Sequence, residues 1–114
     1  MITLGFDSTA KVAAVAVAED DRLLATYQIH NGLTQSELLL PMAEDMLRSL
    51  HLSFSDVGLL CCSVGPGSFT GVRIGVSLVK GLAFGKNLPC VAVSTLEALA
   101  ENLAGLAGVI VACM

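Results

Sequence analysis

Charged side chains are scarce in this sequence. They make up 14% of the 114 residues, whereas hydrophobic residues make up 54%, against roughly 25% and 45–50% in typical soluble domains. A small domain with so few charges is expected to bury part of its exterior against another subunit or another domain. Six Lys and Arg against ten Asp and Glu leave a net charge of −4. Because phosphate binding relies on clustered Lys and Arg, this composition argues against a free-standing nucleic-acid binder.

Long apolar runs and a signal peptide are missing as well. No apolar run approaches the roughly 18 residues that span a bilayer, and the first residues lack a basic n-region and lead directly into strand-like sequence. We therefore expect a cytoplasmic protein without a membrane partner. The cysteines form no C-x-x-C pair and have no histidine at zinc-ligand spacing, which predicts reduced, buried thiols; they are Cys61, Cys62, Cys90 and Cys113.

Recognisable catalytic arrangements are also absent from the sequence. His30 and His51 are isolated, with no His-x-x-x-His pair, so zinc hydrolase chemistry is not supported. Ser63, Ser68 or Thr70 could act as a nucleophile only beside a positioned base, and no candidate pair occurs at recognisable spacing. We therefore expect neither a catalytic residue nor a metal site.

The pattern of apolar residues predicts alternating strands and helices. Expected strands cover residues 2–6, 12–18, 23–29, 57–64, 89–93 and 109–114, and expected helices cover residues 34–50, 70–84 and 95–103. The order is βββαβαβα plus a final strand. It predicts an α/β fold with a mixed five-stranded sheet flanked by helices, as in ribonuclease H-like domains. We expect such a lobe over residues 1–108, and residues 109–114 to begin a second, truncated lobe.

The helix expected at 34–50 begins with a capping box, in which Thr34 and Glu37 each satisfy a free backbone amide of the first turn. Pro41 removes one hydrogen bond inside the helix, so we expect a bend or a looser backbone near Glu37. The apolar residues cover more than the single stripe that a helix on one sheet needs, and part of this band is expected to meet a partner. They are Leu38, Leu39, Leu40, Met42, Ala43, Met46, Leu47 and Leu50.

A glycine-rich turn connects the fourth expected strand to the second expected helix. Gly65, Gly67 and Gly71 let a phosphate, a backbone or a second helix come close. A phosphate cradle would use free amides at the helix N-terminus, but the turn lacks the Gly-Lys-Ser/Thr ending of a P-loop and is one residue too long for the dinucleotide fingerprint. We favour a packing device, in which Gly71 and Gly75 let a second helix approach.

Asp7 and Arg73 are the charged candidates near this turn. Asp7 ends the first expected strand and could hold a metal-bound water beside a nucleotide phosphate, but such chemistry usually needs a second acid, and a turn or cap role is equally open. Arg73 could pair with a phosphate or with a partner's carboxylate, or stay solvated. A nucleotide-binding enzyme that uses Asp7, Thr9, Gly65 and Gly67 around ATP and Mg²⁺ is therefore the alternative to an interaction subunit.

Four segments of the sequence together carry a family resemblance. They are Gly65-Pro66-Gly67-Ser68-Phe69-Thr70-Gly71-Val72-Arg73-Ile74-Gly75, the opening Phe6-Asp7-Ser8-Thr9, the helical Leu39-Leu40-Pro41-Met42, and Val93-Ser94-Thr95-Leu96-Glu97-Ala98-Leu99-Ala100. In this order the chain resembles the TsaB (YeaZ) family, the bacterial partner subunit of the machinery that makes threonylcarbamoyladenosine in tRNA. The resemblance implies an actin-like ATPase fold of two ribonuclease H-like lobes, of which this chain would be the first.

The resemblance implies an interaction subunit without catalysis of its own. Members of the family form homodimers, pair with a TsaD-type catalytic subunit, join a TsaE-type small ATPase, and support threonylcarbamoyl transfer to the adenosine next to the anticodon. Contact with tRNA would come only through the complex. No cofactor would be intrinsic, and ATP with Mg²⁺ would bind only within the complex.

The resemblance also implies where partners bind, namely on the helices expected at 34–50 and 70–84. Many relatives have His where this chain has Gln35, which is a departure within the implied interface. Carried onto this sequence, the interface comprises Gln35, Leu38, Leu39, Met42, Met46, Gly71, Arg73, Ile74, Gly75 and Leu78.

Overall fold

The computed structural model describes residues 1–8, 12–20, 22–29, 35–66 and 69–94. Over these residues the strands are β1 (Ile2–Asp7), β2 (Ala13–Glu19), β3 (Arg22–Ile29), β4 (Val57–Ser63) and β5 (Cys90–Val93). The helices are α1 (Gln35–Ser49), the short 3₁₀ helix η1 (Phe54–Asp56) and α2 (Phe69–Lys86). The helix expected at 95–103, the strand expected at 109–114 and the expected boundary after residue 108 lie outside the described residues.

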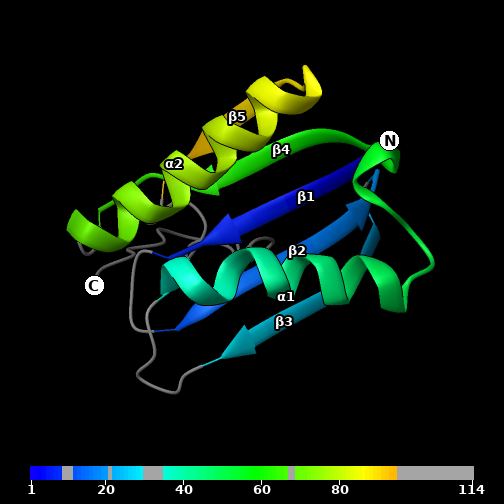
Figure 1. Ribbon diagram of the computed structural model, residues 1–114, viewed down its shortest axis with the longest axis horizontal. Helices are drawn as coiled ribbons and strands as arrows, with labels where there is room; N and C mark the ends of the chain where they lie inside the picture. Colours follow the sequence, from blue (N-terminus) through cyan, green and yellow to red (C-terminus); the bar gives the residue numbers. More distant parts are fainter. Residues whose placement is uncertain (9–11, 21, 30–34, 67–68, 95–114) are drawn as a thin grey trace, which may run out of the picture.

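The strands form one five-stranded sheet in the order β3-β2-β1-β4-β5. The pairs β1–β2 and β2–β3 are antiparallel, whereas β1–β4 and β4–β5 are parallel. Short turns suffice for the antiparallel pairs, and the parallel pairs need the longer connections that contain α1 and α2. Both helices cover the same face of the sheet (Figure 1). The mixed sheet that the sequence predicts is therefore confirmed.

The core lies between the sheet and the two helices. Every second residue of β1 and of the first part of β2 is buried, because successive side chains of a strand point to opposite faces. Each large side chain that is fully buried in this way contributes about 1.5–3 kcal/mol. The inward-facing residues of these two strands are Ile2, Leu4, Phe6, Ala13, Val15 and Val17.

Helix α1 buries a single apolar stripe against the sheet, with members three and four residues apart. Its residues are Leu39, Met42, Ala43, Met46 and Leu47. Leu38 and Leu50 are partly buried against the same core. Most of the apolar band, part of which was expected to meet a partner, therefore packs within the chain. Pro41 is exposed and the helix continues through it.

Helix α2 was expected to end at Phe84 and runs to Lys86 instead. Asn87 adopts a left-handed φ of 54°, and the N–H of Leu88 donates to the carbonyl of Ala83 at 3.0 Å. This is the hydrogen bond of a Schellman cap. Asparagine is among the few residues besides glycine that tolerate this conformation. The helix therefore continues to Lys86 and ends at Asn87. Among the described residues, no helix is long and apolar enough to cross a membrane.

Candidate functional site

Asp7 and Ser63 meet where two parallel strands end. Asp7 is the last residue of β1 and Ser63 is the last residue of β4. The hydroxyl of Ser63 donates a hydrogen bond to Oδ2 of Asp7 at 3.1 Å. This contact gives Asp7 a structural role at the strand end, one of the two roles that the sequence left open.

Ser8, the next residue, is turned towards α2. The residue is only 1% exposed. Its Oγ–H donates a hydrogen bond of 2.5 Å to the carbonyl oxygen of Gly71, which lies in the first turn of α2. A Cβ atom added to Gly75 would lie 2.7 Å from Ser8 Oγ, which is closer than real Cβ contacts come. Gly75 therefore forms a notch in α2, one turn after Gly71, that receives Ser8.

This notch bears on the role expected of the two glycines. Gly71 and Gly75 were predicted to let a second helix approach α2 and to belong to the interface. Both are buried, and both contact Ser8, the residue directly after β1. Gly75 admits a residue of this chain, and the part of the two glycines in a partner interface stays a prediction.

The turn between β4 and α2 is described only in part. Gly65 has a φ of 117°, which side-chain-bearing residues rarely adopt, and it precedes Pro66 through a cis peptide bond. Gly67 and Thr9 lie outside the described residues. The alternative of a phosphate cradle around Gly65 and Gly67 therefore stays a prediction.

A cavity of about 230 Å³ lies on the sheet face opposite the helices. Its lining is mostly apolar and comes from β1, β2, β3, β4 and β5, with Asp7, Thr26 and Ser63 as its polar residues. Asp7 is the one lining residue, among those the structure describes, that carries a charge. A ligand bound here could contact the carboxylate of Asp7.

No metal-binding cluster forms at this site among the described residues, although the thiols of Cys61 and Cys62 line its cavity. Within the described part of the chain, no group of three or more His, Cys, Asp or Glu residues could hold a metal ion. Cys62 is buried, but Cys90 is exposed because it begins the edge strand β5, which corrects the prediction that every thiol is buried. Burial raises the pKa of the Cys61 and Cys62 thiols, and the neighbouring Cys61 and Cys90 raise that of Cys62 further.

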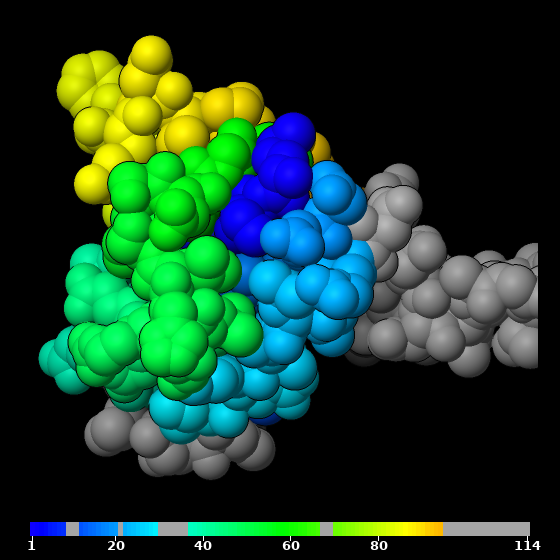
Figure 2. Space-filling view, turned by 90° about the vertical axis from the view of Figure 1, so that its right-hand side faces the viewer, coloured from blue at the N-terminus to red at the C-terminus, as the bar shows by residue number. Residues whose placement is uncertain are grey.

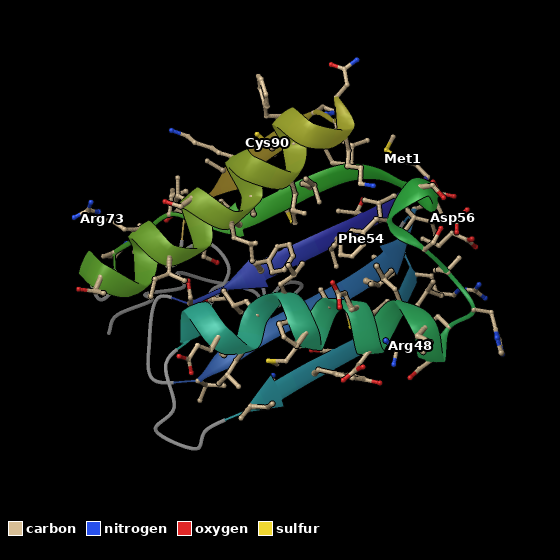
Figure 3. All side chains as sticks on the ribbon, in the orientation of Figure 1. Met1, Arg48, Phe54, Asp56, Arg73 and Cys90 are labelled. Atoms are coloured by element: carbon tan, nitrogen blue, oxygen red, sulfur yellow. The ribbon has the colours of Figure 1, made fainter. Side chains whose placement is uncertain are left out.

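A second cavity, of about 420 Å³, is a groove between α1 and α2. Its floor is apolar and its rim is polar, because the hydroxyl-bearing and cationic residues that line it are exposed. Figure 3 shows Arg73 projecting outwards near the amino-terminal end of α2. The lining residues are Leu39 of α1 and Thr70, Arg73, Ile74, Ser77 and Leu78 of α2.

The groove contains part of the interface implied by the sequence. Leu39, Arg73, Ile74 and Leu78 line it, and Gln35 begins α1. Met42 and Met46 do not reach it, because they fill the core beneath α1 and are 4% and 0% exposed. They were expected to face a partner because the sequence does not show how much of the apolar band of α1 is buried within the chain.

The outer faces of the two helices carry opposite charges, which the sequence reasoning missed. Helix α1 exposes Glu37, Glu44, Asp45 and Arg48, of which Asp45 and Arg48 form an ion pair at 3.0 Å, whereas α2 exposes Arg73, Lys80 and Lys86. A spacing of seven residues, as between Glu37 and Glu44 or between Arg73 and Lys80, places two side chains on the same side of a helix. This spacing is the signal that could have revealed the pattern.

Phe84 extends the outer face of α2 by one more turn. It is 92% exposed, the most exposed of the large hydrophobic side chains that the structure describes. The carboxyl-terminal part of α2, in yellow, forms one edge of the molecule in Figure 2. We call the α1–α2 surface the groove together with Glu37, Glu44, Asp45, Lys80 and Phe84.

Comparison with known proteins agrees with this architecture. A family profile described as TsaD, tRNA N6-adenosine threonylcarbamoyltransferase, matches residues 33–112. The tRNA threonylcarbamoyladenosine biosynthesis protein TsaB of Escherichia coli K12 is 37% identical over 102 residues, which cover 90% of this chain and 44% of that protein. The structure of YeaZ from Pseudomonas aeruginosa has a TM-score of 0.81 at 35% identity, and the match covers 89% of this chain and 46% of the YeaZ chain.

A more distant neighbour supports the fold alone. RuvC of Thermus thermophilus has a TM-score of 0.60 at 14% identity, over 96% of this chain and 73% of the RuvC chain. The sheet order and this likeness define the fold, a ribonuclease H-like lobe with a mixed five-stranded sheet, as the sequence predicted. Within the wider family that the profile describes, the chain belongs to the TsaB (YeaZ) family. It spans about half the length of the relatives that it matches.

Proposed function

We propose that this chain is an interaction subunit in the synthesis of threonylcarbamoyladenosine in tRNA. It binds a TsaD-type catalytic subunit and supports threonylcarbamoyl transfer to the adenosine next to the anticodon, without catalysing the transfer itself. Membership in the TsaB family supports the biosynthetic role. The observation that carries the binding role is the α1–α2 surface, with its apolar groove of about 420 Å³.

The chemistry of this surface suits a protein partner. A fully desolvated apolar centre with a polar rim is the usual anatomy of a protein interface. Here Ile74 and Leu78 offer the apolar floor, and Arg73 at the rim offers a charged donor for a partner's carboxylate. Aromatic residues, phenylalanine among them, are enriched at protein interfaces, and Phe84 supplies an exposed one on the same helix.

The opposite charges of the two helices favour pairing with a second copy. In a two-fold symmetric dimer each patch meets a patch of the other subunit. If α1 of one copy lies against α2 of the other, the acidic face that contains Glu37 and Glu44 meets the basic face that contains Arg73 and Lys80, twice. Homodimer and TsaD-type complex would then compete for the same α1–α2 surface.

Further partners follow from the same role. A TsaE-type small ATPase joins the complex, and ATP with Mg²⁺ binds only there. The tRNA contacts this chain only through the complex, because a net charge of −4 gives it little attraction for phosphates.

Reconstitution tests the proposal directly. The chain, a TsaD-type subunit, a TsaE-type ATPase and unmodified tRNA are combined, and the modified adenosine is quantified by mass spectrometry. Omission of the chain should abolish modification, and Arg73→Glu should reduce it, because a reversed charge repels the carboxylate that Arg73 is proposed to meet. Lys86→Glu is the matched control, since it reverses an exposed charge at the far end of the same helix. Equal modification with and without the chain would refute the proposal.

A second candidate function is nucleotide binding by the isolated chain. The observation that favours it is the position of Asp7 in the cavity of about 230 Å³. Calorimetric titration with Mg-ATP separates the two: binding that Asp7→Ala abolishes supports the nucleotide-binding enzyme, and an absence of heat supports the interaction subunit.

A further inference from the structure

The connection from β4 to α2 is held at its two ends by two consecutive residues, Asp7 at the end of β1 and Ser8 directly after it. At the strand end, Ser63 donates to Asp7. At the helix end, Ser8 donates to Gly71. Ser8 and Ser63 are the buried polar residues of the described chain, so the polar contacts of its interior are concentrated on this connection.

Asp7 and Ser8 point to opposite sides of the sheet, as consecutive residues of an extended chain do. Asp7 lines the cavity on the open face, whereas Ser8 enters the notch of Gly75 under α2. The pair therefore ties the end of β4 to the start of α2 through one short stretch of backbone.

The turns of α2 that Ser8 contacts also carry the groove. Thr70, Arg73 and Ile74 line the groove and belong to the same turns as Gly71 and Gly75. Because each helical residue is rotated by about 100° from the last, a small rotation of these turns changes which side chains face the groove. The hydrogen bond and the notch together fix that rotation.

We infer that Asp7 and Ser8 are positioning residues for partner binding: by holding both ends of the β4–α2 connection, they set the orientation of the first turns of α2 and so the shape of the groove. This inference rests on the proposed function, since it concerns the surface through which the TsaD-type subunit is bound. It also gives the carboxylate of Asp7 a use that needs neither a metal ion nor a nucleotide.

The test measures the Kd of purified variants for the TsaD-type subunit by calorimetry, together with their thermal unfolding midpoints. Ser8→Ala removes the donor to Gly71 and should raise the Kd at least about fivefold, the loss of roughly one hydrogen bond. Asp7→Ala should weaken binding similarly. Asp7→Asn should restore binding, because its side-chain oxygen still accepts from Ser63.

A matched control separates positioning from a general loss of stability. Val57→Ala removes buried volume at the opposite end of β4, roughly 20 Å from Ser63 at about 3.3 Å per residue. It should lower the unfolding midpoint and leave the Kd unchanged. If Val57→Ala weakens binding as much as Ser8→Ala does at equal loss of stability, the residues are merely structural and the inference is wrong.

The remaining outcomes are also distinct. Ser8→Ala that binds as tightly as the unaltered chain overturns the inference and leaves the proposed function intact. Asp7→Asn that fails to restore binding shows that the charge, and not the acceptor for Ser63, is what matters, which also overturns it. An unaltered chain that does not bind the TsaD-type subunit refutes the proposed function itself.

Discussion

The hydroxyl of Ser8 reaches across from the end of β1 to the carbonyl of Gly71, a residue 63 positions later in the chain. The contact is made possible by Gly75, whose missing side chain leaves the space that Ser8 Oγ occupies. Strand, glycine turn and helix are therefore fitted to one another at a single buried point. From there α2 extends along the sheet and presents its outer face to solvent.

Substitution at Gly75 tests this fit. Gly75→Ala should lower the free energy of unfolding by about 1–3 kcal/mol, because the new methyl group would press on Ser8 Oγ. The double variant Ser8→Ala/Gly75→Ala should recover most of the loss, since the atom in conflict is gone and the next Ser8 atom lies 3.9 Å away. Urea unfolding measures both.

Gly81→Ala is the matched control on the same helix. Nothing lies within 4 Å of a Cβ atom at this position, so the substitution should stabilise by about 0.5–1 kcal/mol through helix propensity alone. A destabilising Gly81→Ala, or a double variant that is no better than Gly75→Ala, would contradict the fit described for Ser8.

Removal of the Phe84 side chain should weaken association without affecting the fold. Phe84→Ala is expected to raise the Kd of self-association about tenfold, as for an exposed aromatic that becomes buried on binding. The free energy of unfolding of the monomer should change by less than about 0.5 kcal/mol. Sedimentation equilibrium gives the Kd. Leu23→Ala on β3, also exposed, should leave it unchanged, and equal effects of both variants would argue against the α1–α2 surface.

Met46 should behave as a core residue and not as an interface residue. Met46→Ala should cost about 2–5 kcal/mol of stability, because the side chain is fully buried beneath α1. Leu40→Ala, on the same helix but only half-buried, should cost much less. Chemical denaturation compares the two, and a small cost for Met46→Ala would return this residue to the expected interface.

The thiols should differ in reactivity in the order of their exposure. Only the thiolate reacts with a maleimide, so exposed Cys90 should be alkylated first, followed by Cys61 and then Cys62, as read from peptide masses. Because burial raises the pKa of Cys61 and Cys62 in the folded chain above the usual 9.0, the unfolded chain loses these protons at lower pH. Their contribution to stability is therefore constant below about pH 9 and falls as the pH rises above it.

Regular features of the fold could be predicted from the sequence because each depends on a local pattern. Alternating apolar residues placed β1 and β2, and helical spacing placed α1 and α2, within two residues of their ends. The errors occurred where tertiary contacts decide. Most of the apolar band of α1, part of which was expected to meet a partner, is core. A local cap at Asn87 lets α2 continue two residues beyond its expected end.

The site was harder to predict, for a physical reason. A spacing of four between Gly71 and Gly75 indicates that something approaches the helix closely, but not what approaches. The partner is Ser8, which is distant in sequence and carries only a hydroxyl group as a signal. Likewise, exposure distinguishes Arg73 in the groove from Met46 in the core, and exposure depends on the assembled sheet.

Binding of the TsaD-type subunit to the α1–α2 surface is tested most directly by the reactivity of cysteines introduced on that surface and away from it. Ser77→Cys lies on the rim of the groove, and Ser55→Cys lies exposed in η1, away from it. Maleimide labelling of both is followed by peptide mass spectrometry with and without a saturating TsaD-type subunit. If the TsaD-type subunit covers the α1–α2 surface, labelling at position 77 slows at least about tenfold on binding, while labelling at position 55 is unchanged. Unchanged labelling at position 77, or equal slowing at both positions, would contradict binding at this surface.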